Sequence, residues 1–288
     1  MERSARGYSA YGPKEWVRMS EQAASVGRRA EDSGALDVAI RIGLVAYGVV
    51  HLLIGWLALQ LALGDREGQA STSGALGELA RQPFGAVLLW AVAVGMLALV
   101  VWRVLEVIRG EPDEDGAKEW ASRAGSVAKA VIYGYLGFAA AQTALGSGGG
   151  GGGTDTMTSR LMGLPAGPWI VGAVGLAIVG YGLYEIRKAY TEEFTESLSA
   201  GATSGTTGKA YVAFGKAGYT AKGAALAVVG GLFVYAAVTH DARKSGGLDA
   251  ALLEVLQAPA GPYLLGAIAL GIICFGLFCF AQARHLSR

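Results

Sequence analysis

Six stretches without a charged side chain constrain the fold of this sequence more than any other feature. Each is about as long as the roughly 20 residues with which a helix crosses a bilayer. Because lipid offers no hydrogen-bond partners to backbone N–H and C=O groups, each stretch is predicted to be helical. The sequence therefore predicts an all-α polytopic membrane protein with six transmembrane helices. The stretches span Ile42–Leu63, Pro83–Trp102, Ala130–Gly153, Leu161–Tyr184, Gly223–His240 and Val255–Ala283.

The sequence also repeats itself three times. A basic residue, a glycine two positions later and an alanine three positions after that begin at Arg41, Arg123 and Lys216. A proline followed two positions later by glycine recurs at Pro83, Pro165 and Pro259. The offset from the first to the second copy is 82 residues at both landmarks, and from the second to the third it is 93 and 94. Because two separate landmarks recur at nearly equal offsets, the sequence indicates a triplicated unit.

Each unit contains two of the predicted helices, so it enters and leaves on the same side of the membrane. Such repeats are parallel and related by an axis along the membrane normal, which predicts a pseudo-threefold bundle. The predicted divisions are an N-terminal arm over residues 1–36 and repeats over residues 37–110, 120–190 and 211–288. The glycine run Gly148–Gly153 lacks the Gly-Lys-Ser/Thr ending of a phosphate loop and is read as a loop.

Lysine and arginine predict the orientation, because cytoplasmic loops are enriched in these residues. With the N-terminus inside, nineteen fall on the inner side and five on the outer side. We therefore expect a multi-pass protein of the cell (inner) membrane with both termini in the cytoplasm. The formal net charge of +1 argues against nucleic acid as a partner.

The three outer connections and the glycines suggest how the helices are held. Short apolar-periodic segments at Ala75–Ala80, Met157–Leu164 and Leu248–Leu256 are predicted to be short helices at the outer interface. Many of the 45 glycines occur within the apolar stretches at four-residue spacing from another small residue. Such faces let helix backbones approach closely in lipid, so we interpret them mainly as packing surfaces. The pairs include Ala91/Gly95, Ala130/Gly134, Gly223/Ala227/Gly231 and Ala267/Gly271.

Ionisable side chains at membrane depth are candidate functional groups, because burying them is costly. His51 lies ten residues, or roughly 15 Å, from Arg41 and hence near the predicted midplane. Tyr47 lies one turn earlier on the same face. The functional interpretation is a proton-relay or ligand site. The structural interpretation is a neutral histidine that donates one hydrogen bond to a neighbouring carbonyl or hydroxyl group.

A second group of candidates lies toward the cytoplasmic ends of the helices. Arg103 and Glu106 share a helix face, and Glu185 occupies the position of Arg103 in the second repeat. Lys129 and Lys222 occupy the position of Tyr47 in their repeats. Pseudo-threefold symmetry then predicts one ring of mixed charge. The ring is interpreted either as an inner gate or anion site, or as a static salt-bridge layer with snorkelling lysines.

The repeated Arg-x-Gly-x-x-Ala unit and the closing segment Phe275–Arg284 resemble those of bacterial membrane proteins in the domain-of-unknown-function 1206 family. Phe84–Trp90, Leu99–Glu106 and Gly215–Lys222 carry the same resemblance, which covers roughly residues 36–288. The resemblance implies three copies of a two-helix unit. It implies no activity, cofactor or catalytic residue.

The sequence thus favours an integral membrane protein that acts by binding or assembly, with no catalytic residues, metal or cofactor predicted. The bilayer is its expected surroundings, and a second copy or another membrane protein is its expected partner. The alternative is a small-solute or ion transporter or channel with the charged layer as its gate. An enzyme acting on lipid or quinone has the least support, because the sequence contains no recognisable catalytic set. An axis filled by Gly, Ala and Leu side chains would favour the first interpretation, and a hydrated axis the second.

Overall fold

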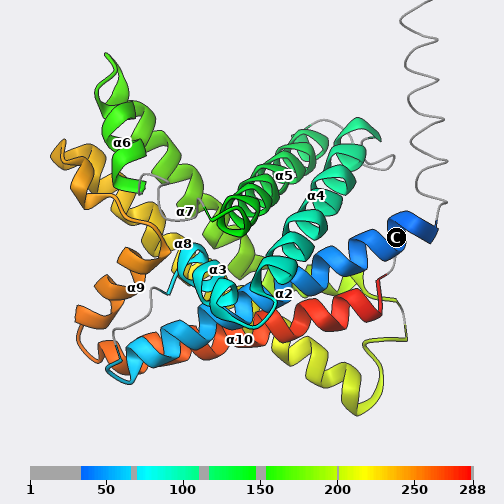
Figure 1. The fold of residues 1–288 in the computed structure, drawn as a ribbon. Helices are drawn as coiled ribbons and strands as arrows, with labels where there is room; N and C mark the ends of the chain where they lie inside the picture. Colours follow the sequence, from blue (N-terminus) through cyan, green and yellow to red (C-terminus); the bar gives the residue numbers. More distant parts are fainter. Residues whose placement is uncertain (1–33, 66–69, 110–116, 147–153, 200, 287–288) are drawn as a thin grey trace, which may run out of the picture.

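Long α-helices dominate the computed structural model, which describes the chain except for residues 1–33, 66–69, 110–116, 147–153, 200 and 287–288 (Figure 1). Six of the helices are long and apolar enough to cross a membrane, which confirms the predicted all-α polytopic fold. Almost all of the predicted arm and the glycine run Gly148–Gly153 lie outside the described residues. The six helices are α2 (Gly34–Ala62), α4 (Gly85–Arg109), α5 (Ala117–Ala144), α7 (Gly167–Thr191), α8 (Gly205–Thr239) and α10 (Gly261–Arg284).

Five of the six helices are longer than the uncharged stretches from which they were predicted, whereas α10 begins at Gly261 and is shorter than its stretch Val255–Ala283. The difference is largest for α8, which begins at Gly205 rather than near Gly223 and contains 35 residues. At about 1.5 Å per residue such a helix is roughly 50 Å long, well beyond a hydrocarbon core of about 30 Å. The uncharged stretch is bounded by Lys222, but the helix extends past it to include Lys216 and Lys209. Lysine is a good helix former and does not end a helix.

Three short helices lie at the predicted positions between the long ones. They are α3 (Thr72–Arg81), α6 (Thr154–Met162) and α9 (Leu248–Gln257). The helix α3 packs on α2, α4 and α5, α9 packs on α8 and α10, and α6 packs on α7 and the 3-10 turn η2 (Ala242–Lys244). Each short helix thus packs against long helices of its own repeat, and α3 and α6 also contact the following repeat.

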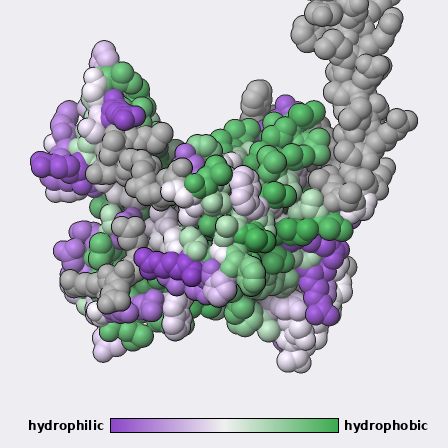
Figure 2. Space-filling view, in the orientation of Figure 1, coloured by the Kyte–Doolittle hydropathy of each residue, from purple (hydrophilic) through white to green (hydrophobic). Residues whose placement is uncertain are grey.

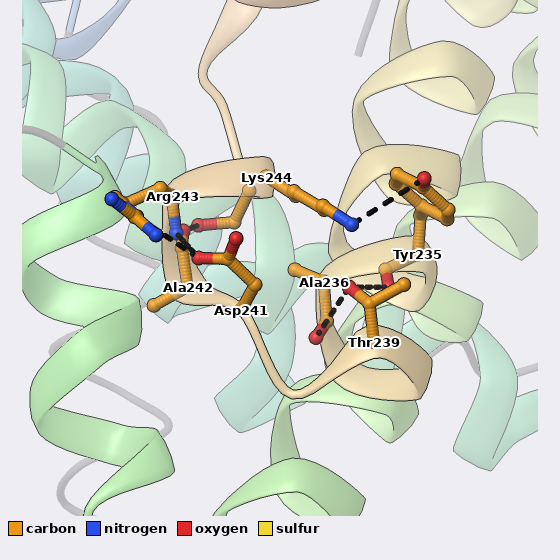
Figure 3. A network of polar contacts seen from close by, with 8 residues as sticks. Tyr235, Ala236, Thr239, Asp241, Ala242, Arg243 and Lys244 are labelled. Atoms are coloured by element: carbon orange, nitrogen blue, oxygen red, sulfur yellow. Dashed lines mark hydrogen bonds and ion pairs between the residues drawn. The ribbon is translucent and has the colours of Figure 1, made fainter.

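Local hydrogen bonds fix the chain where α8 ends and η2 begins (Figure 3). The hydroxyl group of Thr239 donates to the Tyr235 carbonyl oxygen at 2.8 Å. The Asp241 carboxylate accepts from the Arg243 backbone N–H at 3.1 Å, and this bond holds the pKa of Asp241 below its usual value. The Lys244 ammonium lies 4.7 Å from the centre of the Tyr235 ring. These contacts turn the chain sharply from α8 toward α9.

The outer surface of the bundle is apolar, as a lipid environment requires. Figure 2 shows continuous hydrophobic surface over α4 and α5, and hydrophilic groups near α6 and η2. Large apolar side chains such as Val94, Val131 and Phe138 are more than 60% exposed there. Apolar side chains are exposed on this scale only where lipid or a partner covers them.

The long helices follow one another in the spatial order α5, α4, α2, α10, α8, α7. The helices α2 and α10 run side by side, as do α4 and α5, and α7 and α8; the first two pairs are plain in Figure 1. Three of these contacts join different repeats, namely α4 with α5, α7 with α8, and α10 with α2. Over the described part of the chain, α5 and α7 have little or no contact, although they belong to the same repeat. The series of helices is therefore open between them.

Glycine contacts differ among the three repeats in the same way as the helix packing. In the first repeat Gly43 lies directly against the backbone of Gly95, and in the third repeat Gly218 lies against Phe275. The second repeat has Gly125 at the matching position, where a methyl group would have no neighbour within 4 Å. The two helices of the repeated unit thus pack together in the first and third copies and are apart in the second.

The helices α7 and α8 make two further glycine contacts across repeats. A methyl group at Gly182 would lie 2.6 Å from the Gly223 carbonyl oxygen, and one at Gly230 would lie 2.6 Å from the Gly175 carbonyl oxygen. Not every small residue in the predicted spacing is used in this way. Gly231 and Gly134 have open space or only a distant neighbour.

Gly230 and Gly231 therefore provide a matched test of close packing. The change Gly230→Ala should lower the free energy of unfolding by about 1–3 kcal/mol, because the methyl group must push α7 away from α8. The change Gly231→Ala should be neutral or stabilising by up to about 1 kcal/mol, since alanine favours helix and meets no neighbour. Thermal unfolding of both variants in one detergent measures the difference. Equal melting temperatures would contradict the close contact.

Candidate functional site

The first helices of the three repeats meet around the ring of Tyr47 on α2. The ring centre lies 5.2 Å from that of Tyr133 on α5 and 5.9 Å from that of Phe275 on α10. The Lys222 ammonium on α8 lies 5.9 Å from the same ring centre. Tyr47 itself is 5% exposed. One buried residue thus joins elements from all three repeats.

Lys222 and Glu185 form a buried ion pair between α8 and α7. Their charged atoms Nζ and Oε1 are 3.8 Å apart, and the Glu185 side chain is 2% exposed. The Lys222 ammonium also lies 4.7 Å from the centre of the Phe275 ring and 5.9 Å from that of Tyr219. Aromatic faces attract cations, so the rings and the carboxylate together compensate the buried charge. Glu185 Oε2 is buried and has no hydrogen-bond partner among the described residues.

A second ion pair lies within α4, and a hydrogen bond joins it to α5. Arg103 Nη1 donates to Glu106 Oε2 at 2.7 Å, and the Ser126 hydroxyl group donates to the same oxygen at 2.6 Å. The Arg103 side chain is 12% exposed, and its Nε atom has no hydrogen-bond partner among the described residues. The Glu106 carboxylate is therefore engaged, while Arg103 keeps one free donor.

Two further lysines complete this layer. Lys129 on α5 lies within electrostatic range of Arg103, Glu106, Glu185 and Lys188. Lys188 on α7 lies 5.0 Å from the centre of the Tyr219 ring. In the described part of the chain neither ammonium is within ion-pair distance of a carboxylate. The layer therefore contains four basic and two acidic side chains.

His51 lies next to this layer and makes the hydrogen bond of the structural interpretation. Its Nδ1 atom is 2.8 Å from the Tyr47 carbonyl oxygen. Because a carbonyl oxygen only accepts, Nδ1 must carry the hydrogen. The imidazole ring also contacts the rings of Tyr47 and Phe275 at centroid distances of 4.2 and 4.8 Å. A proton-relay or ligand role for His51 stays a prediction.

Aromatic side chains fill the bundle from this layer toward the connection between α7 and α8. Phe194, in the 3-10 turn η1 (Glu193–Ser197), is fully buried and contacts the rings of Tyr219 and Phe278. Gly215 leaves the space that the Phe194 ring occupies. Gln282 on α10 donates to the Ser197 hydroxyl group at 2.7 Å and holds the turn in place. Aromatic rings therefore fill this part of the core, beside the leucine and alanine side chains of the same core.

The structure brings the predicted residues into one region. His51, Tyr47, Lys222 and Glu185 are linked by successive contacts, Arg103 pairs with Glu106, and Lys129 lies between the two groups. Sequence reasoning missed the aromatic surroundings of Lys222, and it missed Lys188 and Ser126. The repeats offered a signal for Lys188, because it occupies the position of Glu106 in the second copy.

The architecture and the buried layer define a polytopic helical membrane protein built from three two-helix repeats. The family model described as "Domain of Unknown Function (DUF1206)" matches the chain three times, at residues 42–110, 124–192 and 217–285, and the chain belongs to this family. "Uncharacterized protein YxxB" of Bacillus subtilis (strain 168) is 30% identical over 234 residues, which cover 80% of this chain and 83% of the relative. No solved structure matches the chain.

Removing one member of the Lys222–Glu185 pair should be more harmful than removing both. Glu185→Gln or Lys222→Met alone leaves one buried charge uncompensated, which typically costs about 3–5 kcal/mol. The double variant should recover most of that loss. Lys216→Met is the matched control, because Lys216 pairs with Glu192 at 2.6 Å where both side chains are about half exposed, and such pairs contribute about 0–1 kcal/mol.

Thermal unfolding of the four proteins in detergent measures this coupling. If the double variant loses as much free energy of unfolding as the two single variants together, Lys222 and Glu185 do not act as a pair.

Proposed function

We propose that the protein is a non-enzymatic membrane binding protein that holds an anion at its buried charged layer. The observation that carries this proposal is the excess of basic over acidic side chains in that layer. Both carboxylates are engaged, Glu185 with Lys222 and Glu106 with Arg103 and Ser126. Lys129 and Lys188 are left without a carboxylate partner among the described residues.

The energetic argument follows from the cost of burying charge. Uncompensated cations within a membrane are expensive, and a bound anion offsets that cost. Lys129 and Lys188 come from α5 and α7, the two helices that are separated in the second repeat. Their like charges disfavour a closer approach of these helices, whereas an anion between them would attract both. The free Nε donor of Arg103 lies in the same electrostatic neighbourhood.

Packing around the layer supports binding without catalysis. The His51 Nδ1 atom is engaged with a backbone carbonyl oxygen, and the imidazole ring is enclosed by Tyr47 and Phe275. A general base needs a lone pair directed at a substrate proton within hydrogen-bond reach. Because Nδ1 carries the hydrogen, the lone pair of the ring is on Nε2, and no nucleophile among the described residues is hydrogen-bonded to that atom.

A transporter or channel is the second candidate function. The observation that favours it is the asymmetry of the repeats, because α5 and α7 are apart where the equivalent helices of the other repeats are packed. Closing that gap would change access to the charged layer, which would then act as the gate. Flux into liposomes separates the two functions, since a binding protein retains the anion without moving it.

Native mass spectrometry of protein extracted with its surrounding lipid tests the binding proposal. Mass beyond integer multiples of the 29.6 kDa chain is expected in the wild type. The double variant Lys129→Gln/Lys188→Gln should lose most of that mass, because it removes both unpaired cations. Lys216→Gln is the control, since its ammonium is already paired with Glu192. A bare wild-type chain, or a double variant that carries every adduct of the wild type, would contradict the proposal.

The same spectra report the number of copies in the assembly. We propose that exposed apolar faces, such as that of α7 with Trp169 and Leu176, contact lipid or a further membrane chain. A mass at twice or three times that of the chain would identify a second copy as the partner.

We also propose that both termini face the cytoplasm from an inner membrane. The distribution of nineteen and five basic residues supports this orientation. A reporter that is active only in the cytoplasm should work when fused after Arg288 and fail when inserted beside Gly64 in the outer connection of the first repeat. The reverse pattern would overturn the orientation.

A further inference from the structure

A surface groove of about 380 Å³ lies between the start of α2 and the end of α10. Its lining is mainly apolar, with Ile42, Val45 and Phe280, and Arg41 and Arg284 border it. The end of the described chain lies beside the start of α2 at this place (Figure 1). The groove is separate from the charged layer and independent of the function proposed for that layer.

The groove combines two cations with an apolar wall. Both arginines are exposed, and Arg41 Nη1 donates to the Arg284 backbone carbonyl oxygen at 3.3 Å, which holds the Arg41 side chain across the helix interface. No carboxylate of the described residues is within ion-pair distance of either guanidinium group. Ile42 and Val45 are 48% and 43% exposed beside them.

Comparison with the other two repeat interfaces shows that this combination is particular to α2 and α10. At the α7–α8 interface Tyr190 and Lys216 stand at the matching positions, and Lys216 is already neutralised by Glu192 at 2.6 Å. At the α4–α5 interface Ile108 and Arg123 stand there, with a single cation. Repetition of the unit alone therefore does not account for two adjacent unpaired arginines.

We infer that this groove binds an anionic phospholipid, with its phosphate on Arg41 and Arg284 and its acyl chain along Ile42, Val45 and Phe280. Guanidinium groups match phosphate oxygens in geometry and charge. Arg284 is the last residue of α10, and Arg41 lies seven residues after the start of α2, directly before the uncharged stretch that begins at Ile42. Basic residues that border an apolar span lie near the depth of the lipid headgroups. The apolar wall favours a lipid over a free phosphate ion, because a free ion has no chain to place there.

Lipid titration of the full-length protein tests this site, with native mass spectrometry as the measurement. Phosphatidylglycerol should bind more tightly than phosphatidylcholine with the same chains. Arg284→Gln and Arg41→Gln should each weaken phosphatidylglycerol binding by about fivefold, the loss expected for one basic residue near the membrane surface. Arg81→Gln, an exposed arginine of α3, is the control and should leave the affinity unchanged.

Arg284→Gln is the decisive variant, because it keeps the backbone carbonyl group to which Arg41 donates. Its melting temperature without added lipid should equal that of the wild type, which separates lost binding from lost folding. Unchanged phosphatidylglycerol affinity in this variant would overturn the inference. Inorganic phosphate that competes at equal concentration would also overturn it, since the site would then bind a free anion. If Arg284→Gln still binds the anion proposed for Lys129 and Lys188, the two sites are separate.

Discussion

The buried ion pair of Lys222 and Glu185 is the interaction on which the arrangement of the core depends. The pair can form only because Gly182 and Gly223, one turn and one residue away, let the backbones of α7 and α8 touch. The rings of Tyr47, Tyr219 and Phe275 then enclose the ammonium group with side chains from α2, α8 and α10. In lipid there is little hydrophobic drive between helices, so close backbones and compensated charges must supply the cohesion.

Triplication accounts for the repeated pairs of helices. Differences between the copies at equivalent positions account for the charged and aromatic side chains in the core. The position of Tyr47 in the first repeat is occupied by lysine in the other two, and the position of Arg103 by Glu185 and Cys279. A threefold-symmetric core would place three like charges or three like rings together. The observed set instead pairs a cation of the third repeat with a carboxylate of the second, against a phenol of the first.

The sequence predicts the repeats, the six long helices and the three short ones, because each leaves a local pattern in charge, spacing or proline position. It does not predict where α8 begins, since Lys209 and Lys216 interrupt the uncharged stretch while the helix continues. Nor does it distinguish Gly95, which packs on Gly43, from Gly134, which packs loosely. The candidate charges were predicted, but the aromatic rings around Lys222 depend on contacts between repeats that no local pattern encodes.

The separation of α5 and α7 is related to the charged side chains that these two helices carry. Closing the second repeat as the other two are closed would bring Lys129 and Lys188 closer together while both carboxylates of the layer are engaged. Like charges repel more strongly at low dielectric constant, so a closer approach of the two lysines is disfavoured. Gly125, which has space around it, sets no steric limit on closure. The like charges of the two lysines, rather than Gly125, therefore oppose closure of the second repeat.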